Sequence, residues 1–148
     1  MSRHGYDYDE DYPNAGALYM QRVKNAAKGR RGQALFRELL EALDAMPVKE
    51  LASRAVVRKG ECCALGSLAL HRGIDLSPIE LPEGEDEDDD GDWSTEWLRD
   101  ELGIVDCLAR EIVYENDDCG PAGETPAERW VRMRNLVTKN ITAKPETA

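Results

Sequence analysis

The most concentrated chemistry in the sequence is a run of carboxylates between residues 83 and 92. Carboxylate oxygens at alternate positions are calcium ligands, but an EF-hand loop also needs a bidentate glutamate at its twelfth position. If Gly91 is the sixth residue of such a loop, the twelfth is Trp97. The run is therefore not expected to be an EF-hand. Its eight acidic residues are Glu83, Glu85, Asp86, Glu87, Asp88, Asp89, Asp90 and Asp92.

Two other interpretations of the acidic run remain open. It could mimic a phosphate backbone and compete for a DNA- or RNA-binding protein, because such proteins gain affinity from neutralising closely spaced negative charge. It could also be a solvated linker between helices, which the sequence favours because a block of like charges repels itself. If a partner is bound through carboxylates, the candidates are Asp86, Asp88, Asp89, Asp90, Asp92, Asp117 and Asp118.

Asp117 and Asp118 belong to a second polar stretch, YENDDCGPAGETP at residues 114–126. Asn116 can adopt the left-handed conformation that ends a helix, and the two glycines allow a sharp turn. The stretch therefore predicts a capped helix–loop–helix, the ordinary chemistry of turns. The alternative is a binding loop in a metal- or nucleotide-dependent enzyme, with Asp117 and Asp118 exposed.

The cysteines do not form a catalytic or metal-binding pattern. A nucleophilic thiol needs a base within reach and a lowered pKa. On one helix, His71 would lie about 12–14 Å from Cys62 and Cys63 at 1.5 Å per residue, which is too far. Cys107 and Cys119 complete no recognised zinc spacing with them. We expect reduced, mostly buried thiols and no catalytic residue, metal or cofactor.

The charge of the chain is distributed unevenly. The net charge of −11 over 148 residues becomes about neutral when the acidic run and four acids of residues 1–13 are set aside. Residues 20–60 are basic by contrast, so an acidic segment could lie over them and screen them. The total charge opposes nucleic-acid binding. With no long apolar run and no apolar N-terminal stretch, a cytoplasmic protein is predicted.

Apolar spacing predicts an all-α protein: a single compact domain of five or six helices, with at most a small piece of sheet near 55–59. The capping-box pattern of Thr125, Pro126 and Glu128 marks the start of the last helix. The domain covers 14–141, with a loop at 74–92, a flexible acidic arm at 1–13 and a frayed tail at 142–148. The expected helices are 14–28, 33–45, 61–72, 94–102, 105–116 and 125–141.

Three motifs, CCALGSLA, ELGI with END, and ETPAERW, resemble a group of small helical proteins encoded by phages and prophages. The resemblance covers about residues 33–141. It implies a phage accessory protein in the host cytoplasm and carries no catalytic residue. The matching residues are Cys63, Leu65, Gly66, Leu102, Gly103, Leu108, Asn116, Asp117, Pro126 and Trp130.

The sequence thus predicts a non-enzymatic phage accessory protein that binds a host or phage protein, for example to inhibit a host defence system. The nucleic-acid mimic and the enzyme using residues 114–126 are the alternatives.

Overall fold

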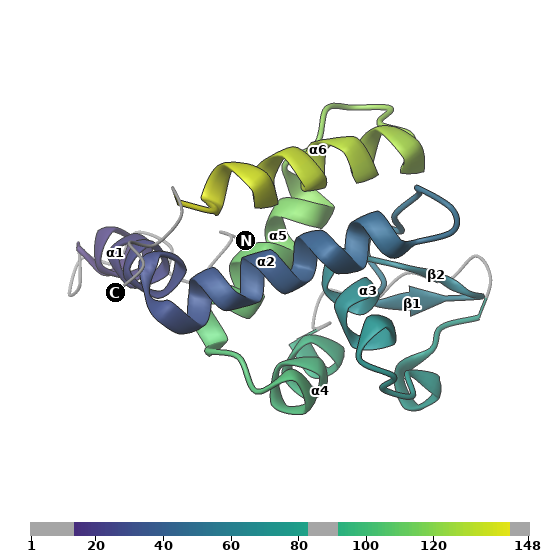
Figure 1. Ribbon diagram of the computed structural model, residues 1–148, viewed down its shortest axis with the longest axis horizontal. Helices are drawn as coiled ribbons and strands as arrows, with labels where there is room; N and C mark the ends of the chain where they lie inside the picture. The colour runs from purple at the N-terminus through teal and green to yellow at the C-terminus, as the bar shows by residue number, and fades with distance from the viewer. Residues whose placement is uncertain (1–13, 83–91, 143–148) are drawn as a thin grey trace.

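The computed structural model describes residues 14–82 and 92–142, and these form six α-helices and one small β-hairpin (Figure 1). The all-α prediction is confirmed. A single 3₁₀ turn, η1 (Ser77–Ile79), lies in the loop after the third helix. The helices are α1 (Ala15–Lys28), α2 (Arg30–Ala45), α3 (Ala64–His71), α4 (Asp92–Leu102), α5 (Asp106–Asp118) and α6 (Pro126–Asn140).

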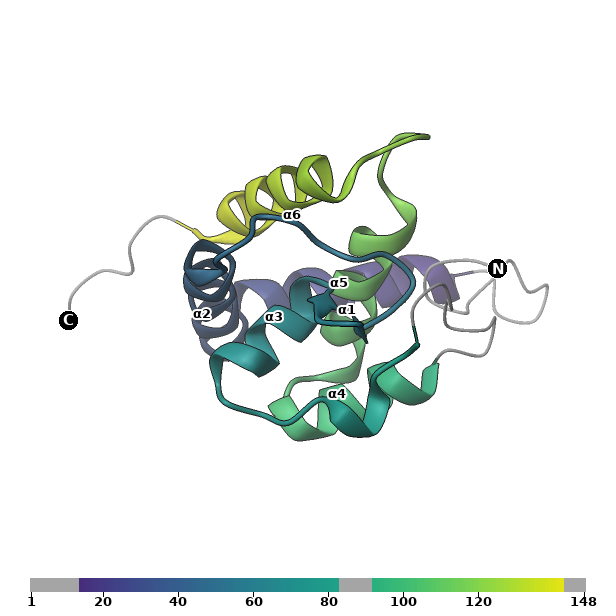
Figure 2. The same ribbon diagram turned by 90° about the vertical axis from the view of Figure 1, so that its right-hand side faces the viewer.

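Helix α2 is the central element of the fold. Its apolar stripe is buried, and it contacts α1, α3 and α6 along its length. Helix α5 packs against α1, α3, α4 and α6. In Figure 2, α3 lies between α2 and α5, with α6 above and α4 below. The largest fully buried apolar side chains include Leu39, Leu43, Leu65, Leu98 and Met133.

The break between α1 and α2 is one residue, Gly29, and not the predicted stretch of 29–32. The second helix therefore begins at Arg30, three residues before its predicted start. Gly32 is inside α2, where a Cβ atom would lie 1.8 Å from the backbone oxygen of Ala26 in α1. This glycine serves a close helix crossing, which sequence reasoning mistook for a helix break.

The third helix is also shorter than predicted. Its first residues form instead β2 (Glu61–Cys62), which pairs antiparallel with β1 (Val57–Arg58). Lys59 and Gly60 connect the strands with φ angles of 48° and 82°, the positive values that a two-residue hairpin turn requires. Cys62 is thus a strand residue, and Cys63 is the N-cap of α3.

The capping predicted from the sequence is present at the start of α6 and absent at two other helix ends. The capping box of Thr125 and Glu128 is present in full at the start of α6. Asn14, the first residue of the predicted helix 14–28, is the residue before α1 and makes no side-chain capping bond. Asn116 was expected to end a helix in a left-handed conformation, and that prediction is wrong, because it lies inside α5. Residues 1–13, 83–91 and 143–148, with the predicted arm, most of the acidic run and nearly all of the tail, fall outside the described residues.

Replacement of Gly32 by alanine should destabilise the protein strongly. The new methyl group would overlap the backbone of α1, so the two helices must separate at their crossing, at a cost of about 3 kcal/mol or more. Chemical denaturation of Gly32→Ala would measure the loss. The control is Ala34→Gly at an exposed site of the same helix, which should cost only about 1 kcal/mol through helix propensity. A Gly32→Ala variant as stable as the wild type would contradict the close crossing.

Candidate functional site

The structure does not gather the predicted partner-binding aspartates into one site. Four of them, between residues 86 and 90, lie outside the described residues, and Asp92 opens α4 with a side chain that is also outside them. Asp117 and Asp118 end α5, the first half-buried and the second exposed. A role for these seven residues in binding stays a prediction.

Asn116 is the centre of a buried hydrogen-bond network. Its side chain has no exposed surface. Its oxygen accepts from the backbone N–H of Ala64 at 3.0 Å, and its amide nitrogen donates to the carbonyl of Ala52 at 2.9 Å. The amide therefore joins α5 to the first turn of α3 and to the chain segment that follows α2.

Asp117 and Asp118 support the same segment from outside. The carboxylate of Asp117 accepts from the backbone N–H of Arg54 at 3.0 Å, and Arg54 has a φ angle of 56°. The side chain of Arg54 lies 3.6 Å from the exposed carboxylate of Asp118. These contacts hold a neighbouring turn against the end of α5. The helix–loop–helix predicted for residues 114–126 is present, with the capping box at the start of α6 and without the predicted cap at Asn116.

Glu124 is a buried carboxylate that sequence reasoning missed. Its side chain is 5% exposed and pairs with Arg132 at 2.6 Å and with Arg129 at 3.3 Å. Arg132 also donates to the carbonyls of Glu115 and Asn116, so the pair ties α6 to the end of α5. The bonded carboxylate raises the pKa of Arg132. The available signal was the spacing of Arg129 and Arg132, which places both on one face of a helix that follows the loop.

The adjacent thiols are structural, as predicted. Cys62 and Cys63 are both buried. The sulfur of Cys63 accepts from the N–H of Gly66 at 3.3 Å and so caps α3. Burial raises the pKa of Cys62 to about 11. A thiol with that pKa is almost entirely protonated at neutral pH, so it is a poor nucleophile.

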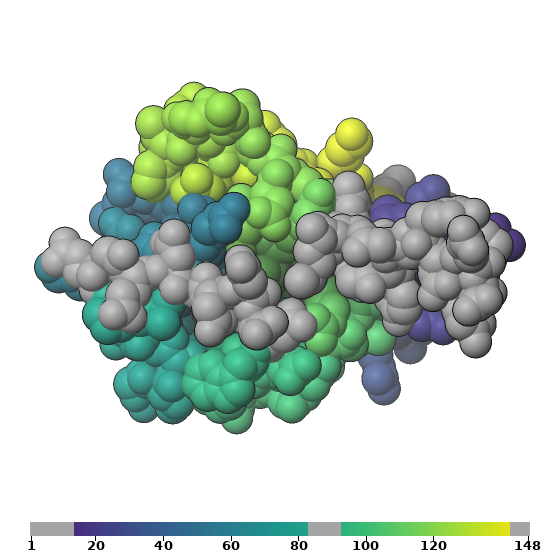
Figure 3. All heavy atoms as spheres, turned by 180° about the vertical axis from the view of Figure 1, so that it is seen from behind, coloured from purple at the N-terminus to yellow at the C-terminus, as the bar shows by residue number. Residues whose placement is uncertain are grey.

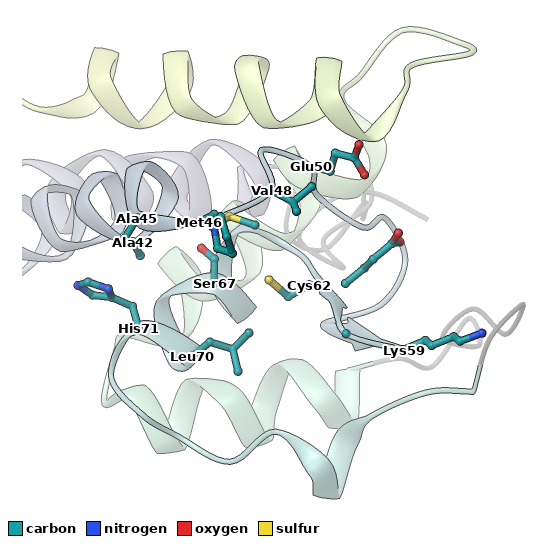
Figure 4. A pocket seen from close by; sticks show the side chains of 13 residues that line it. Ala42, Ala45, Met46, Val48, Glu50, Lys59, Cys62, Ser67, Leu70 and His71 are labelled. Carbon is teal, nitrogen blue, oxygen red and sulfur yellow. The ribbon is translucent and has the colours of Figure 1, made fainter.

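An open groove that no sequence pattern suggested lies on the described surface (Figure 4). Its volume is about 540 Å³. Ala42 and Ala45 contribute from α2, Leu70 and His71 from α3, and the segment after α2 closes the opposite side. The remaining lining residues are Met46, Pro47, Val48, Glu50, Lys59, Gly60, Glu61, Cys62 and Ser67.

The groove carries exposed apolar side chains on two of its sides. Val48 is 59% exposed and Leu70 is 48% exposed, and both belong to the few large hydrophobic residues on the described surface. They come from separate segments that only folding brings together. The charged residues Glu50, Glu61 and Lys59 lie around the opening, with the Lys59 amine directed away from it in Figure 4.

Replacement of Asn116 by alanine should destabilise the protein by about 3 kcal/mol. The change leaves the N–H of Ala64 without its partner and removes a donor from the carbonyl of Ala52, and each unsatisfied buried group costs about 1–3 kcal/mol. Denaturant titration would measure this loss. The matched control is Asn135→Ala at an exposed position of α6, which should change stability by less than about 0.5 kcal/mol. Equal effects of the two changes would show that the network does not stabilise the fold.

Alkylation should separate the cysteines by burial and pKa. In the folded protein at pH 7.5, iodoacetamide should modify exposed Cys119 first, and buried Cys62 and Cys63 slowest. Because the pKa of Cys62 is about 11, its rate should rise about tenfold for each pH unit up to that value while the fold holds. Peptide mass spectrometry identifies the modified residue. Rapid modification of Cys62 at neutral pH would contradict the assignment of this thiol as structural.

Two kinds of site are not present in the part of the chain that the structure describes. Within residues 14–82 and 92–142, no group of three or more His, Cys, Asp or Glu side chains is placed to hold a metal ion. Over the same ranges, no helix is both long and apolar enough to cross a membrane.

Seen from behind, α5 lies between α4 and α6 on the described surface (Figure 3). The groove beside α2 and α3, which carries exposed apolar side chains on two of its sides, is the candidate functional site. Comparison of the chain with protein-family models, with curated proteins and with solved structures finds no match.

Proposed function

We propose that the protein is a non-enzymatic binding protein that holds an apolar segment of a protein partner in the groove between α2, α3 and the hairpin. The observation that carries this proposal is the pair of exposed side chains, Val48 and Leu70, on two sides of one groove. Exposed apolar side chains that line a concave surface are typical of sites that bury a partner's side chain.

The polar residues of the groove support binding over catalysis. The hydroxyl of Ser67 donates to the carbonyl of Ala64 at 2.5 Å, within its own helix. The pKa of Cys62 is about 11, because the thiol is buried. Neither group is thus prepared as a nucleophile, which would need a nearby base to take its proton.

The occupant that fits this groove is a protein segment with one or two large apolar side chains between polar ones. The floor is apolar, with Ala42, Ala45 and Met46. The opening carries charges of both signs, from Glu50, Glu61 and Lys59. A floor that takes apolar groups and a rim that stays in water is the usual anatomy of a protein interface.

The more specific role of a phage accessory protein, such as an inhibitor of a host defence, rests on the motif resemblance alone. The mimicry alternative rests on aspartates outside the described residues. The enzyme alternative loses support, because the side chains of Asn116, Asp117 and Glu124 are engaged in bonds within the fold.

Charge placed in the groove should abolish partner binding without unfolding the protein. In the double variant Val48→Glu, Leu70→Glu, a bound apolar partner would remove the water around two carboxylates without replacing its hydrogen bonds. This cost should weaken binding about a hundredfold. Both side chains are already exposed, so the melting temperature should change little. The first measurement is the amount of each bacterial protein that immobilised wild type and variant recover from a lysate. The dissociation constant of the purified partner is then measured by titration.

The matched control is Val131→Glu, which puts the same charge on an exposed apolar residue of α6 away from the groove. The proposal requires a protein that is recovered by the wild type and by this control but not by the groove variant. If every protein bound by the wild type is retained equally by the groove variant, the groove is not the binding site.

A further inference from the structure

The chain from Asn14 to Arg37 contains no acidic residue, although the complete protein carries 30. This stretch makes up all of α1 and the first half of α2. It holds six basic side chains, five of them exposed and Arg37 half-buried. They are Arg22, Lys24, Lys28, Arg30, Arg31 and Arg37.

None of these six side chains forms an ion pair with any residue in 14–82 or 92–142. Basic residues elsewhere in the same ranges behave differently. Arg72 forms a bidentate pair with Glu38, and Arg134 does so with Asp44. The described residues are nearly balanced, with 17 basic and 18 acidic side chains. The six cations are therefore unpaired among the described residues because no carboxylate of those residues lies within ion-pair distance of them.

Part of this basic stretch converges where α1 meets α2. The connection is Gly29 alone, so Lys28, Arg30 and Arg31 are neighbours at the corner that Figure 1 shows at the left end of α2. The buried amide of Gln33 donates to the carbonyls of Ala27 and Asn140, which brings the end of α6 to the same corner.

Lys139, beside Asn140, is exposed and also lacks an ion pair within the described residues. We call Lys28, Arg30, Arg31 and Lys139 the basic elbow. Three chain segments supply its charges, and the packing around Gln33 holds those segments together.

The position of Arg30 and Arg31 is unfavourable for the stability of α2. They are in its first turn, where the helix dipole is positive and where acidic residues are favoured. This turn contains no acidic residue and receives no side-chain capping bond from Gly29. Lys28 and Lys139 differ from these arginines, because they lie in the last turns of α1 and α6, where cations are favourable. No carboxylate from residues 14–82 or 92–142 pairs with any of the four cations, so all four are open to an anion that these residues do not supply.

We propose that the basic elbow binds a carboxylate-rich segment of a protein partner. The guanidinium groups of Arg30 and Arg31 suit bidentate pairing with carboxylates. Nucleic acid offers the same sign of charge, but a nucleic-acid-binding domain is expected to be strongly basic overall, whereas this fold is nearly neutral and the chain carries −11.

The elbow is distinct from the groove. Helix α2 has 16 residues and so is about 24 Å long at 1.5 Å per residue, with the elbow at its start and the groove at its end. The two sites can therefore be tested separately, and failure at one does not decide the other.

The first test is the binding of two labelled probes to the full chain, a short oligoglutamate peptide and an oligothymidylate of equal charge. By fluorescence anisotropy at low salt, the peptide should bind, and Arg30→Gln, Arg31→Gln should weaken it about tenfold. The matched control, Arg54→Gln, Lys59→Gln, removes two exposed cations distant from the elbow and should bind like the wild type. No peptide binding, equal losses in both variants, or preferential binding of the oligothymidylate would overturn the proposal.

The second test separates binding from a structural role. Arg30→Glu, Arg31→Glu should abolish peptide binding and raise the melting temperature by roughly 2 °C or more, because the new charges complement the dipole of α2. A lower melting temperature would mean that the two arginines stabilise the fold, and the proposal would then be wrong.

Discussion

The amide of Asn116 is the interaction on which the rest of the structure depends. It lies in α5 and bonds to two chain segments, at Ala52 and Ala64, that also pair with each other through the backbone N–H of Ala52 and the carbonyl of Cys62. A side chain that both accepts and donates is needed, because the groups it satisfies are a buried N–H and a buried carbonyl. This bond orients the start of α3, and α3 in turn supplies Leu70 to the groove. The candidate site is thus fixed by a residue that does not line it.

A second buried group extends this constraint to the last helix. Glu124 holds Arg132, and Arg132 donates to the carbonyls at the end of α5, next to Asn116. A buried carboxylate is costly unless it is paired and bonded. Glu124 accepts two hydrogen bonds from Arg132 and forms a further ion pair with Arg129. The polar stretch 114–126 therefore belongs to the core of the fold. Its acidic residues support the fold first, which leaves little of that stretch available to bind a substrate.

Sequence reasoning succeeded where the signal was local. The capping box at Thr125 and the apolar stripe of α2 follow from residues within one or two turns. It failed where the deciding atom was distant in the chain. Gly32 faces the backbone of Ala26 across a helix crossing, and Asn116 faces Ala52 and Ala64, so neither role has a local pattern. The groove was missed for the same reason, because its apolar side chains come from different segments.

Whether a cation of the described residues is paired depends on its position in the fold. Most of the arginines outside α1 and the first half of α2 are used to join elements, such as Arg72 to Glu38 and Arg134 to Asp44. Residues 14–37 contain no carboxylate to pair with their cations, and the fold brings none from other described residues. Helix α2 consequently separates two chemically different surfaces, a cationic one at its start and an apolar one at its end. A partner that contacts both must span the length of this helix, which favours an extended polypeptide over a compact ligand.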